Sequence, residues 1–305
     1  MGVNAAAAVG LALLLDLTLS EFPSRLHPVV WFGRAAGAVD RESDHPLVVG
    51  TAAAVGLPLL AAVVAGGLVA LASTVSSLLA VALAGVVLFS TTSLRMLLDE
   101  VRAVVAATES DVEDARERLR SLAGRDSSDL SAGQLRSAAV ESAAENLADG
   151  LVAPLLAFAV GSVVSLPVAA AAAAWVKGVN TLDSMLGYRS KRVGTPSARL
   201  DDAVMWLPAR ASALLLAVAA GAPRALAAAR KHADAPPSPN SGWPMATLAA
   251  ALGVRLEKPD VYTLPYGPDY PTVNEGRHAV RVVGTAGVLA TLLTALLVSG
   301  VVSWP

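Results

Sequence analysis

The feature that most restricts this chain is a long stretch without charge. No charged residue occurs over positions 46–94, about 49 residues, whereas one helix crossing the hydrocarbon core of a bilayer needs only about 20. Pro58 and the adjacent pair Gly66 and Gly67 offer points where such a stretch can be interrupted. The stretch therefore predicts two membrane-spanning helices, near 47–67 and 70–94, joined by a very short connection.

Composition supports a membrane protein. Hydrophobic residues make up 54% of the sequence and charged residues only 16%, with a mean hydropathy of +0.57. A soluble domain carries roughly 25% charged residues to cover its surface. The net charge of −2 provides no basic surface for nucleic acid, and the lack of cysteine excludes disulfides and thiolate metal sites.

Other apolar runs add further spans. Residues 3–19 and 282–304 are long enough to cross a bilayer. No lysine or arginine precedes the first run, so we expect a retained span rather than a cleaved signal peptide. Segments 151–176 and 203–222 are apolar but broken by proline, glycine or arginine. Together these runs predict an all-α fold, a polytopic helical membrane protein forming one domain over residues 1–305.

The distribution of positive charge predicts orientation. All 23 lysines and arginines fall in four segments, 20–45, 95–150, 177–210 and 223–281, and the positive-inside rule places them all in the cytoplasm. We therefore expect an active site on the cytoplasmic side of the cell membrane, built from a helical segment over 95–150 and a loop region over 223–281. Each broken segment would then form a short re-entrant hairpin. Alternatively, a single crossing by each would place 177–210 outside.

Three carboxylates recur every fourth residue in the sequence ESAAENLADG. Glu141, Glu145 and Asp149 would share one helix face, beside Asn146. Like charges at this spacing repel by roughly a few tenths of a kcal/mol per pair, so a bound Mg²⁺ would stabilise them. The alternative is a solvated helix face neutralised by Arg136.

A second polar cluster follows in KGVNTLDSMLGY. An ammonium, an amide, a carboxylate and a hydroxyl are spaced to lie on one helix face, from Lys177, Asn180, Asp183 and Ser184. Because Lys177 directly follows an apolar run, it could instead be a snorkelling anchor at the membrane interface. The unusual polar combination favours a functional site.

Paired acids beside an arginine form a third candidate. Asp201 and Asp202 lie close to Arg199 in the sequence, a combination that suits a metal-bound phosphate. The alternative is a helix cap formed by Asp201, with acids placed favourably in the first turn.

Two loops give weaker signals. Trp243, in PNSGWPM, offers a flat surface for a large planar ligand, although tryptophan is also common at membrane interfaces. Arg125, in GRDSSDL, could bind an anion, or the segment could simply end one helix at Gly124 and begin the next. The sequence contains no Walker or dinucleotide-binding glycine motif, so a nucleotide would bind by another route.

Taken in order, these segments resemble the CobD/CbiB family of cobalamin biosynthesis. The resemblance covers nearly the whole chain and is most specific in the central blocks containing NTLDSM and ARLDD. One departure precedes the HPV block, where the family commonly has Gly-Asp-Pro and this chain has Glu21 as its only acid. The matching blocks are LHPVVWFGR (26–34), GRD (124–126), ESAAENLADGLVAPL (141–155), KGVNTLDSMLGY (177–188), SARLDDAVMWLPAR (197–210) and PNSGWPM (239–245).

The resemblance implies an activity. Family members are multi-pass membrane proteins that join the carboxylate of adenosylcobyric acid to (R)-1-aminopropan-2-ol O-2-phosphate, or to aminopropanol, consuming ATP with Mg²⁺. The implied product is adenosylcobinamide phosphate, formed late in adenosylcobalamin biosynthesis. The implied partners are these small molecules, the lipid bilayer and other membrane enzymes of the late pathway, but no nucleic acid.

Resemblance and chemistry together assign expected roles. A carboxylate acylates an amine only after activation, and ATP can convert it to an acyl phosphate, which calls for Mg²⁺ and phosphate ligands. The expected catalytic residues are Glu141, Glu145, Asp149, Lys177 and Asp183, and the expected metal ligands are Glu141, Glu145, Asp201 and Asp202. The expected substrate-binding residues are His27, Arg125, Asn146, Asn180, Ser184, Tyr188, Arg199, Asn240, Trp243 and Met245. Among these, Trp243, Met245 and Tyr188 are assigned to the corrinoid, and Arg199, with Lys177, to the phosphate of the amine.

Two other classes of function are alternatives. A transporter or channel would also contain intramembrane acids and broken helices. A non-catalytic membrane sensor could keep the same fold. The sequence contains no inverted repeat, which counts against a transporter, and its intact acidic and basic blocks count against a sensor.

Overall fold

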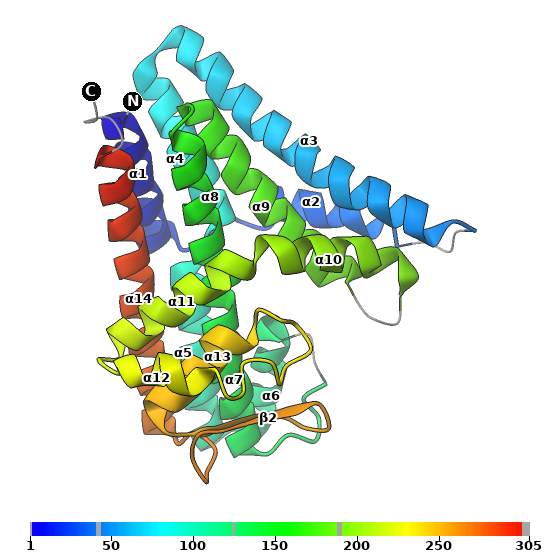
Figure 1. Cartoon of the computed structure of the whole chain (residues 1–305), viewed down its shortest axis with the longest axis vertical. Helices are drawn as coiled ribbons and strands as arrows, with labels where there is room; N and C mark the ends of the chain where they lie inside the picture. Colours follow the sequence, from blue (N-terminus) through cyan, green and yellow to red (C-terminus); the bar gives the residue numbers. More distant parts are fainter. Residues whose placement is uncertain (1, 41–43, 124–125, 188–190, 301–305) are drawn as a thin grey trace. The chain divides into compact units, whose positions relative to one another are not determined.

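The chain folds almost entirely into helices, as Figure 1 shows. Helices suit an apolar chain because each one satisfies its own backbone hydrogen bonds within lipid. The all-α polytopic fold predicted from the sequence is confirmed. The computed structural model describes residues 2–40, 44–123, 126–187 and 191–300.

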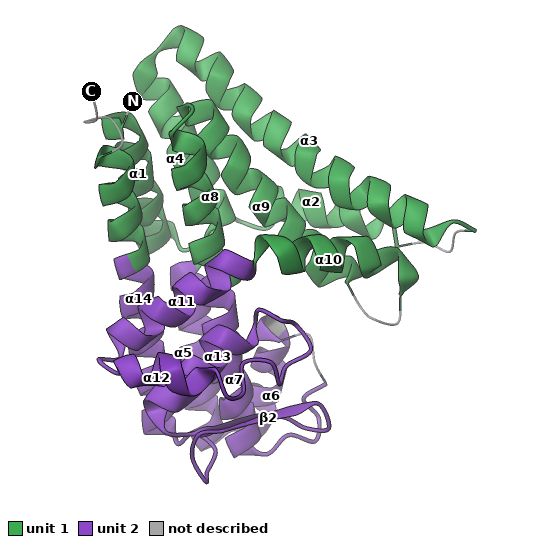
Figure 2. Ribbon diagram, viewed as in Figure 1, with its two compact units in different colours: residues 1–93, 149–205, 290–305 green, residues 94–148, 206–289 purple. Residues whose placement is uncertain are grey.

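Two compact units, coloured separately in Figure 2, each combine segments that are distant in sequence. Unit 1 comprises residues 1–93, 149–205 and 290–305, and unit 2 comprises residues 94–148 and 206–289.

Several helices have the length and apolar character of membrane spans. Within the described residues there are five, Gly2–Leu19, Pro46–Val75, Ser77–Ser110, Ala132–Ser162 and Val273–Gly300. A sixth would form if Arg192–Val204 and Trp206–Ala219 together make one broken span. The first and last of the five coincide with the predicted spans 3–19 and 282–304, except that residues 301–304 lie outside the described part of the chain.

Unit 1 is built around helix α9 (Leu166–Leu186), which packs against most other helices of the unit. In Figure 1, α3 and α9 lie side by side over much of their length. The other elements are α1 (Gly2–Leu19), α2 (Pro28–Gly37), α3 (Pro46–Val75), α4 (Ser77–Thr91), the π turn η1 (Ala148–Val152), α8 (Ala153–Ser162), the 3₁₀ turn η2 (Arg192–Gly194) and α10 (Thr195–Val204).

Small residues allow the helices of unit 1 to approach closely. A Cβ added at Gly66 would come within 3.0 Å of the Ala171 side chain, and one at Gly178 within 3.1 Å of Pro58. Such contacts between small residues are typical of helix packing in membranes, where van der Waals contact replaces the hydrophobic driving force.

The predicted break between 67 and 70 is wrong. Helix α3 continues through Gly66 and Gly67 and ends at Val75, and the new helix begins after Ser76. The Ser76 hydroxyl accepts a hydrogen bond from the Leu79 amide at 3.1 Å and so caps α4. The glycine pair serves packing instead, because Gly66 is buried against α9.

The segment 151–176, predicted to be broken by Pro154, Gly161 and Pro167, is broken between Gly161 and Pro167 but not at Pro154. Helix α7, the π turn and α8 together form a continuous helical run, Ala132–Ser162, so the predicted boundary at 150 lies inside it. The chain then turns at 163–165 and returns as α9, whose first turn is capped by the Ser165 hydroxyl. Helices α8 and α9 pack against each other.

Unit 2 contains shorter, more polar helices and one small sheet. Helices α5 and α6 confirm the predicted helical character of the segment that begins at residue 95. The elements are α5 (Leu94–Ser110), α6 (Val112–Leu122), α7 (Ala132–Leu147), α11 (Trp206–Ala219), α12 (Pro223–Ala229), α13 (Gly242–Leu252), β1 (Arg255–Lys258), β2 (Tyr262–Pro265) and the first part of α14 (Val273–Gly300).

The region 223–281, predicted to be a loop, has regular structure. It contains helices α12 and α13, the start of α14, and an antiparallel hairpin in which Leu256 pairs with Leu264, both fully buried. Asp260 makes the turn with φ of 60°, a conformation that aspartate tolerates better than most residues. Strands of four residues are too short for alternation to reveal them in the sequence.

Candidate active site

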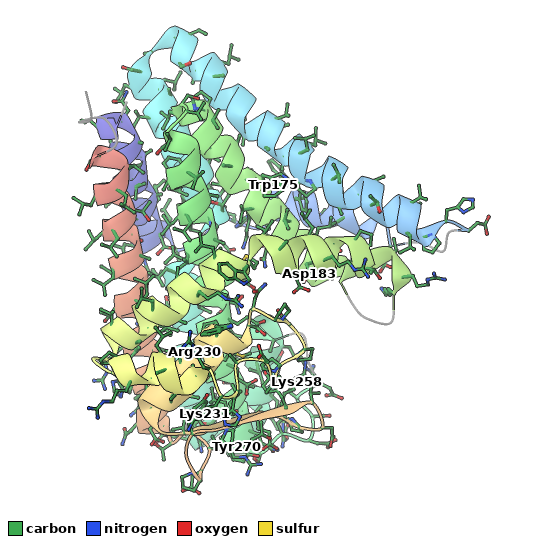
Figure 3. The ribbon with its side chains drawn as sticks, viewed as in Figure 1. Trp175, Asp183, Arg230, Lys231, Lys258 and Tyr270 are labelled. Atoms are coloured by element: carbon green, nitrogen blue, oxygen red, sulfur yellow. The ribbon has the colours of Figure 1, made fainter. Side chains whose placement is uncertain are left out.

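Four aspartates and one lysine gather in unit 1. Asp149 comes from the π turn, Lys177 and Asp183 from α9, and Asp201 and Asp202 from α10. Electrostatic interactions link Asp201 to the other three aspartates, and Asp149 to Lys177. Residues predicted from separate sequence blocks therefore meet in one site. Asp183 is labelled in Figure 3.

The π turn that carries Asp149 has a local cause. Pro154 has no amide hydrogen, so it cannot donate to the Gly150 carbonyl as an ordinary helical residue would. The amide of Ser93 donates to that carbonyl instead, at 3.0 Å. Single π turns within α-helices are frequent at functional sites.

The Asn180 side chain connects two of the aspartates. It is buried, with 8% of its surface exposed, and it forms side-chain hydrogen bonds with both Asp149 and Asp201. A buried amide that holds two carboxylates fixes their side-chain conformations. Asn180 thus positions the two carboxylates, and its predicted role in substrate binding stays a prediction.

Two carboxylate oxygens of the cluster lack a hydrogen-bond partner. Oδ1 of Asp183 and Oδ1 of Asp201 are buried and accept no hydrogen bond. The Asp183 carboxylate packs directly against Gly187. Any larger residue at position 187 would clash with it, since a Cβ there would lie only 1.9 Å from Asp183 Oδ1. Buried carboxylate oxygens without donors are costly, so a cation or a donor from a ligand would stabilise them.

The fit to Mg²⁺ depends on the ligands that a substrate supplies. Among the described residues, no group of three or more His, Cys, Asp or Glu side chains is arranged to hold a metal ion alone. Mg²⁺ usually keeps several waters and binds through one or two carboxylates plus substrate phosphates. Asp183 and Asp201 fit that need. The Mg²⁺ assignment of Glu141, Glu145 and Asp202 stays a prediction.

Lys177 is the cation of the site. It interacts electrostatically with Asp149 and, to a smaller extent, with Glu21, the acid that stands where the family commonly has an aspartate. The Nε2 of His27 lies 3.1 Å from Glu21, while its Nδ1 accepts a hydrogen bond from the Val29 amide. Nε2 is therefore the nitrogen that carries the proton toward Glu21.

An apolar groove of about 400 Å³ borders Lys177 within unit 1. Helices α2, α3, α4 and α9 supply its walls, and Lys177 and Thr181 are among its few polar residues. The ammonium of Lys177 therefore stands between an acidic cluster and an apolar surface.

Two other predicted residues of unit 1 lie at its surface. Ser184 is exposed, and its hydroxyl donates to the Asn180 carbonyl at 3.0 Å. Arg199 is also exposed, one helical turn before Asp202. The helical face predicted for Lys177, Asn180 and Asp183 exists, but the Ser184 hydroxyl is bonded to the helix itself.

Glu141 has a different environment, in unit 2. It is fully buried, and its carboxylate accepts hydrogen bonds from the Ser137 hydroxyl at 2.8 Å, the Glu257 amide at 3.1 Å and the Tyr262 hydroxyl at 2.6 Å. The donors from Glu257 and Tyr262 tie α7 to the β-hairpin. The geometry favours an anchoring role for Glu141 rather than the predicted catalytic one.

The remaining polar residues of α7 are also in unit 2. Glu145 is half-buried, and the Asn146 amide donates to the Ser142 carbonyl at 2.9 Å, one turn earlier on the same helix. Two predicted residues, Arg125 and Tyr188, lie outside the described residues.

A hollow of about 640 Å³ in unit 2 contains Trp243. Arg210 lies over two indole rings, 4.7 Å from the centroid of Trp206 and 5.2 Å from that of Trp243, and donates to Asn240 Oδ1 at 2.6 Å. Arg230 also lines the hollow and is labelled in Figure 3. Two aromatic faces and two guanidinium groups suit a large ligand with polar substituents.

Met245 does not belong to that hollow. Only 1% of its surface is exposed, and its sulfur lies 3.7 Å from the Tyr262 hydroxyl oxygen. The prediction that Met245 presents a surface to the corrinoid is therefore wrong. Helix α13 begins within the segment PNSGWPM. Because Trp243 and Met245 are two positions apart on this helix, their side chains point in different directions.

Sequence reasoning missed several residues of these sites. Tyr262 and Ser137 complete the shell around Glu141, and Trp206 forms the second aromatic wall of the hollow. Trp206 and Arg210 are four residues apart in WLPAR, a spacing that could have indicated their stacking.

Known proteins resemble the chain over nearly its full length. The family model described as CobD/Cbib protein matches residues 9–290. The probable cobalamin biosynthesis protein CobD of Methanothrix thermoacetophila is 39% identical over 94% of this chain and 95% of its own length. The corresponding protein of Thermococcus kodakarensis is 37% identical over 95% of both chains, and that of Rhodobacter capsulatus is 36% identical over 85% and 84%. No solved structure is significantly similar. The chain therefore belongs to the CobD/CbiB family of cobalamin biosynthesis proteins.

Proposed function

We propose that this protein is an amide-forming ligase that joins adenosylcobyric acid to (R)-1-aminopropan-2-ol O-2-phosphate, or to aminopropanol, at the expense of ATP. The observation that carries the proposal is the acidic cluster of unit 1, in which Asp183 and Asp201 each bury an oxygen without a donor. Such a site suits both a metal-bound phosphate and an incoming ammonium group.

The chemistry has two balanced steps. A carboxylate oxygen of the corrinoid attacks the γ-phosphorus of ATP, which forms an acyl phosphate and releases ADP. The amine nitrogen then attacks the acyl carbon, the carbon–oxygen bond to phosphate breaks, and inorganic phosphate leaves. The ammonium of the amino alcohol must lose a proton before it attacks, and a second proton leaves as the amide forms.

The residues of the cluster have distinct parts in this scheme. A carboxylate such as Asp149 binds the ammonium and accepts its proton, while Asn180 fixes the carboxylate's orientation. Lys177 offers a charge-assisted donor to a phosphate oxygen. Asp183 and Asp201 would hold Mg²⁺, which when bound neutralises phosphate charge.

The hollow around Trp243 and Trp206 is the proposed contact surface for part of the corrinoid. Indole rings cover a broad planar ligand without many hydrogen bonds, and Arg210 and Arg230 are placed to bind its amide or carboxylate groups. We place the site on the cytoplasmic side of the cell membrane, because the lysines and arginines flank the apolar runs there under the positive-inside rule.

A direct assay tests the proposal. Protein purified into nanodiscs is supplied with adenosylcobyric acid, either amine, ATP and Mg²⁺, and products are separated by chromatography and mass spectrometry. We expect an amide product and one ADP per amide; when the amine is omitted, no amide forms and ADP release stops after about one ADP per protein, because the acyl phosphate is not consumed. Absence of amide with both amines would overturn the ligase, and corrinoid uptake by proteoliposomes without amide formation would support the transporter.

A further inference from the structure

A second charged site lies in unit 2, away from the residues used above. Helix α5 and the start of α14 border a hollow of about 520 Å³ that three arginines and an asparagine line. Its apolar floor consists of Val105, Ala106 and Val280. The polar residues are Arg102, Asn274, Arg277 and Arg281.

Helical spacing and close packing bring these residues together. Asn274, Arg277 and Arg281 recur at i, i+3 and i+7 and therefore lie on one face of α14. A Cβ at Gly276 would come within 2.9 Å of the Val105 side chain, and one at Gly284 within 3.2 Å of Leu98. These contacts fix α14 against α5, so the arginines converge as a consequence of the packing.

Positive charge exceeds negative charge around the hollow. Asp99 lies 2.6 Å from Arg102 but also 3.5 Å from Arg95, and Glu109 pairs with Arg277 at 3.0 Å. Arg281 has no hydrogen-bond or ion-pair partner among the described residues. Of the three arginines that line the hollow, Arg102 and Arg277 each pair with an acid, and Arg281 does not.

The hollow lies where the sequence changes from charged to apolar. Arg281 is followed directly by the uncharged run that begins at Val282, and on the neighbouring helical run Ser77–Ser110 the first charge is Arg95. At such a boundary the phosphates of a bilayer are found, and basic pockets between helices there bind anionic headgroups.

We propose that this arginine hollow binds the phosphate headgroup of an anionic phospholipid. The phosphate lies against the guanidinium of Arg281, with Arg102, Arg277 and Asn274 as further donors, and the glycerol end of the lipid lies over the apolar floor. The site is independent of the proposed ligase activity and uses none of its residues.

Lipid binding can be measured by native mass spectrometry of the full-length protein released from detergent. The probes are phosphatidylglycerol and, as the zwitterionic comparison, phosphatidylcholine. We expect preferential binding of phosphatidylglycerol, about fivefold weaker in Arg281→Gln, since one arginine near a lipid surface contributes a factor of this size. Arg281→Lys should keep most of the affinity, and Arg120→Gln, an exposed arginine of α6 outside the hollow, should be unchanged.

Three results would overturn the proposal. Equal binding of the two lipids, or wild-type affinity in Arg281→Gln, would remove the headgroup site. Displacement of phosphatidylglycerol by inorganic phosphate or ATP at low millimolar concentration would show that the hollow takes a soluble anion instead. If Arg281→Gln fails to fold, Arg102→Gln gives the same comparison from the other helix, and the same fivefold loss is expected.

Discussion

The buried carboxylates of the two units differ in what surrounds them. In unit 2, Glu141 receives hydrogen bonds from a hydroxyl, an amide and a phenol, so its charge is already stabilised by the fold. In unit 1, Asp183 and Asp201 each keep a buried oxygen that no donor reaches. A carboxylate whose acceptors are all used holds the structure, and one whose acceptors are vacant is available to a ligand. The sequence spacing alone did not separate these two cases.

The largest effect expected from this comparison is in turnover. Asp183→Asn removes one of the two carboxylates proposed to hold Mg²⁺ and should lower kcat at least about 100-fold, because a bound metal ion contributes several kcal/mol of charge stabilisation in the transition state. Thermal stability should not fall, because the change relieves repulsion between aspartates. The measurement is amide formation by purified protein, with the melting temperature recorded in the same detergent.

Asp129→Asn is the matched control, since Asp129 is exposed and belongs to neither site. Its turnover should equal that of the wild type. Wild-type turnover in Asp183→Asn would remove Asp183 from the reaction and with it the distinction drawn between the two carboxylate environments.

The next effect is on stability in unit 2. Tyr262→Phe deletes the hydroxyl that donates to Glu141 at 2.6 Å and leaves a buried carboxylate oxygen with fewer donors. Loss of a hydrogen bond to a charged group costs about 1.5–3 kcal/mol. Chemical unfolding in mild detergent should show this loss while kcat per folded molecule stays near the wild-type value. A fall in kcat without a fall in stability would assign Glu141 to catalysis.

A smaller effect is expected for substrate affinity. Trp243→Ala removes one aromatic wall of the unit 2 hollow and should raise KM for adenosylcobyric acid about tenfold, while KM for ATP and the amine stay constant. Steady-state kinetics with each substrate varied in turn provide the measurement. Met245→Leu is the control, because Met245 is buried and a similar volume keeps the packing. A parallel rise in all three KM values would argue against a corrinoid contact.

The smallest effect concerns the choice of amine. Arg199 is exposed, so its removal should cost little with aminopropanol and about fivefold in kcat/KM with the phosphorylated amine. Arg199→Ala and Arg199→Lys, each assayed with both amines, distinguish lost charge from lost side chain. Equal losses toward both amines would take Arg199 out of the amine-phosphate site and point to ATP.

The lengths of the uncharged runs predicted most of the membrane-spanning helices, but they did not predict where each helix ends. The apolar run over 46–94 contains two helices as predicted, yet they separate at Ser76 rather than at Gly66 and Gly67. A glycine in a membrane helix serves close packing as readily as a break, and only the partner helix decides between these uses. The β-hairpin was not predicted, because strands of four residues are too short to show an alternating pattern.

The sequence predicted which residues belong to the candidate site, but not which residues each of them contacts. Periodicity placed Lys177, Asn180 and Asp183 on one face of α9, which the structure supports. The stripe of Glu141, Glu145 and Asp149 looked uniform in sequence, but Glu141 meets Tyr262, more than a hundred residues away, and Asp149 meets Asn180. Such long-range contacts carry no signal in a single sequence.

Because one amide, that of Asn180, joins Asp149 to Asp201, the site has an order of assembly. The ribosome delivers Asp149 first, then the amide, and Asp201 last. A nascent chain that stops before residue 201 holds the π turn and the amide but lacks the second carboxylate. Asp149 and Asp183 must therefore be inserted at the membrane before Asp201 has been synthesised. Fragments that end before α10 should bind no substrate, even where their membrane-spanning helices are complete.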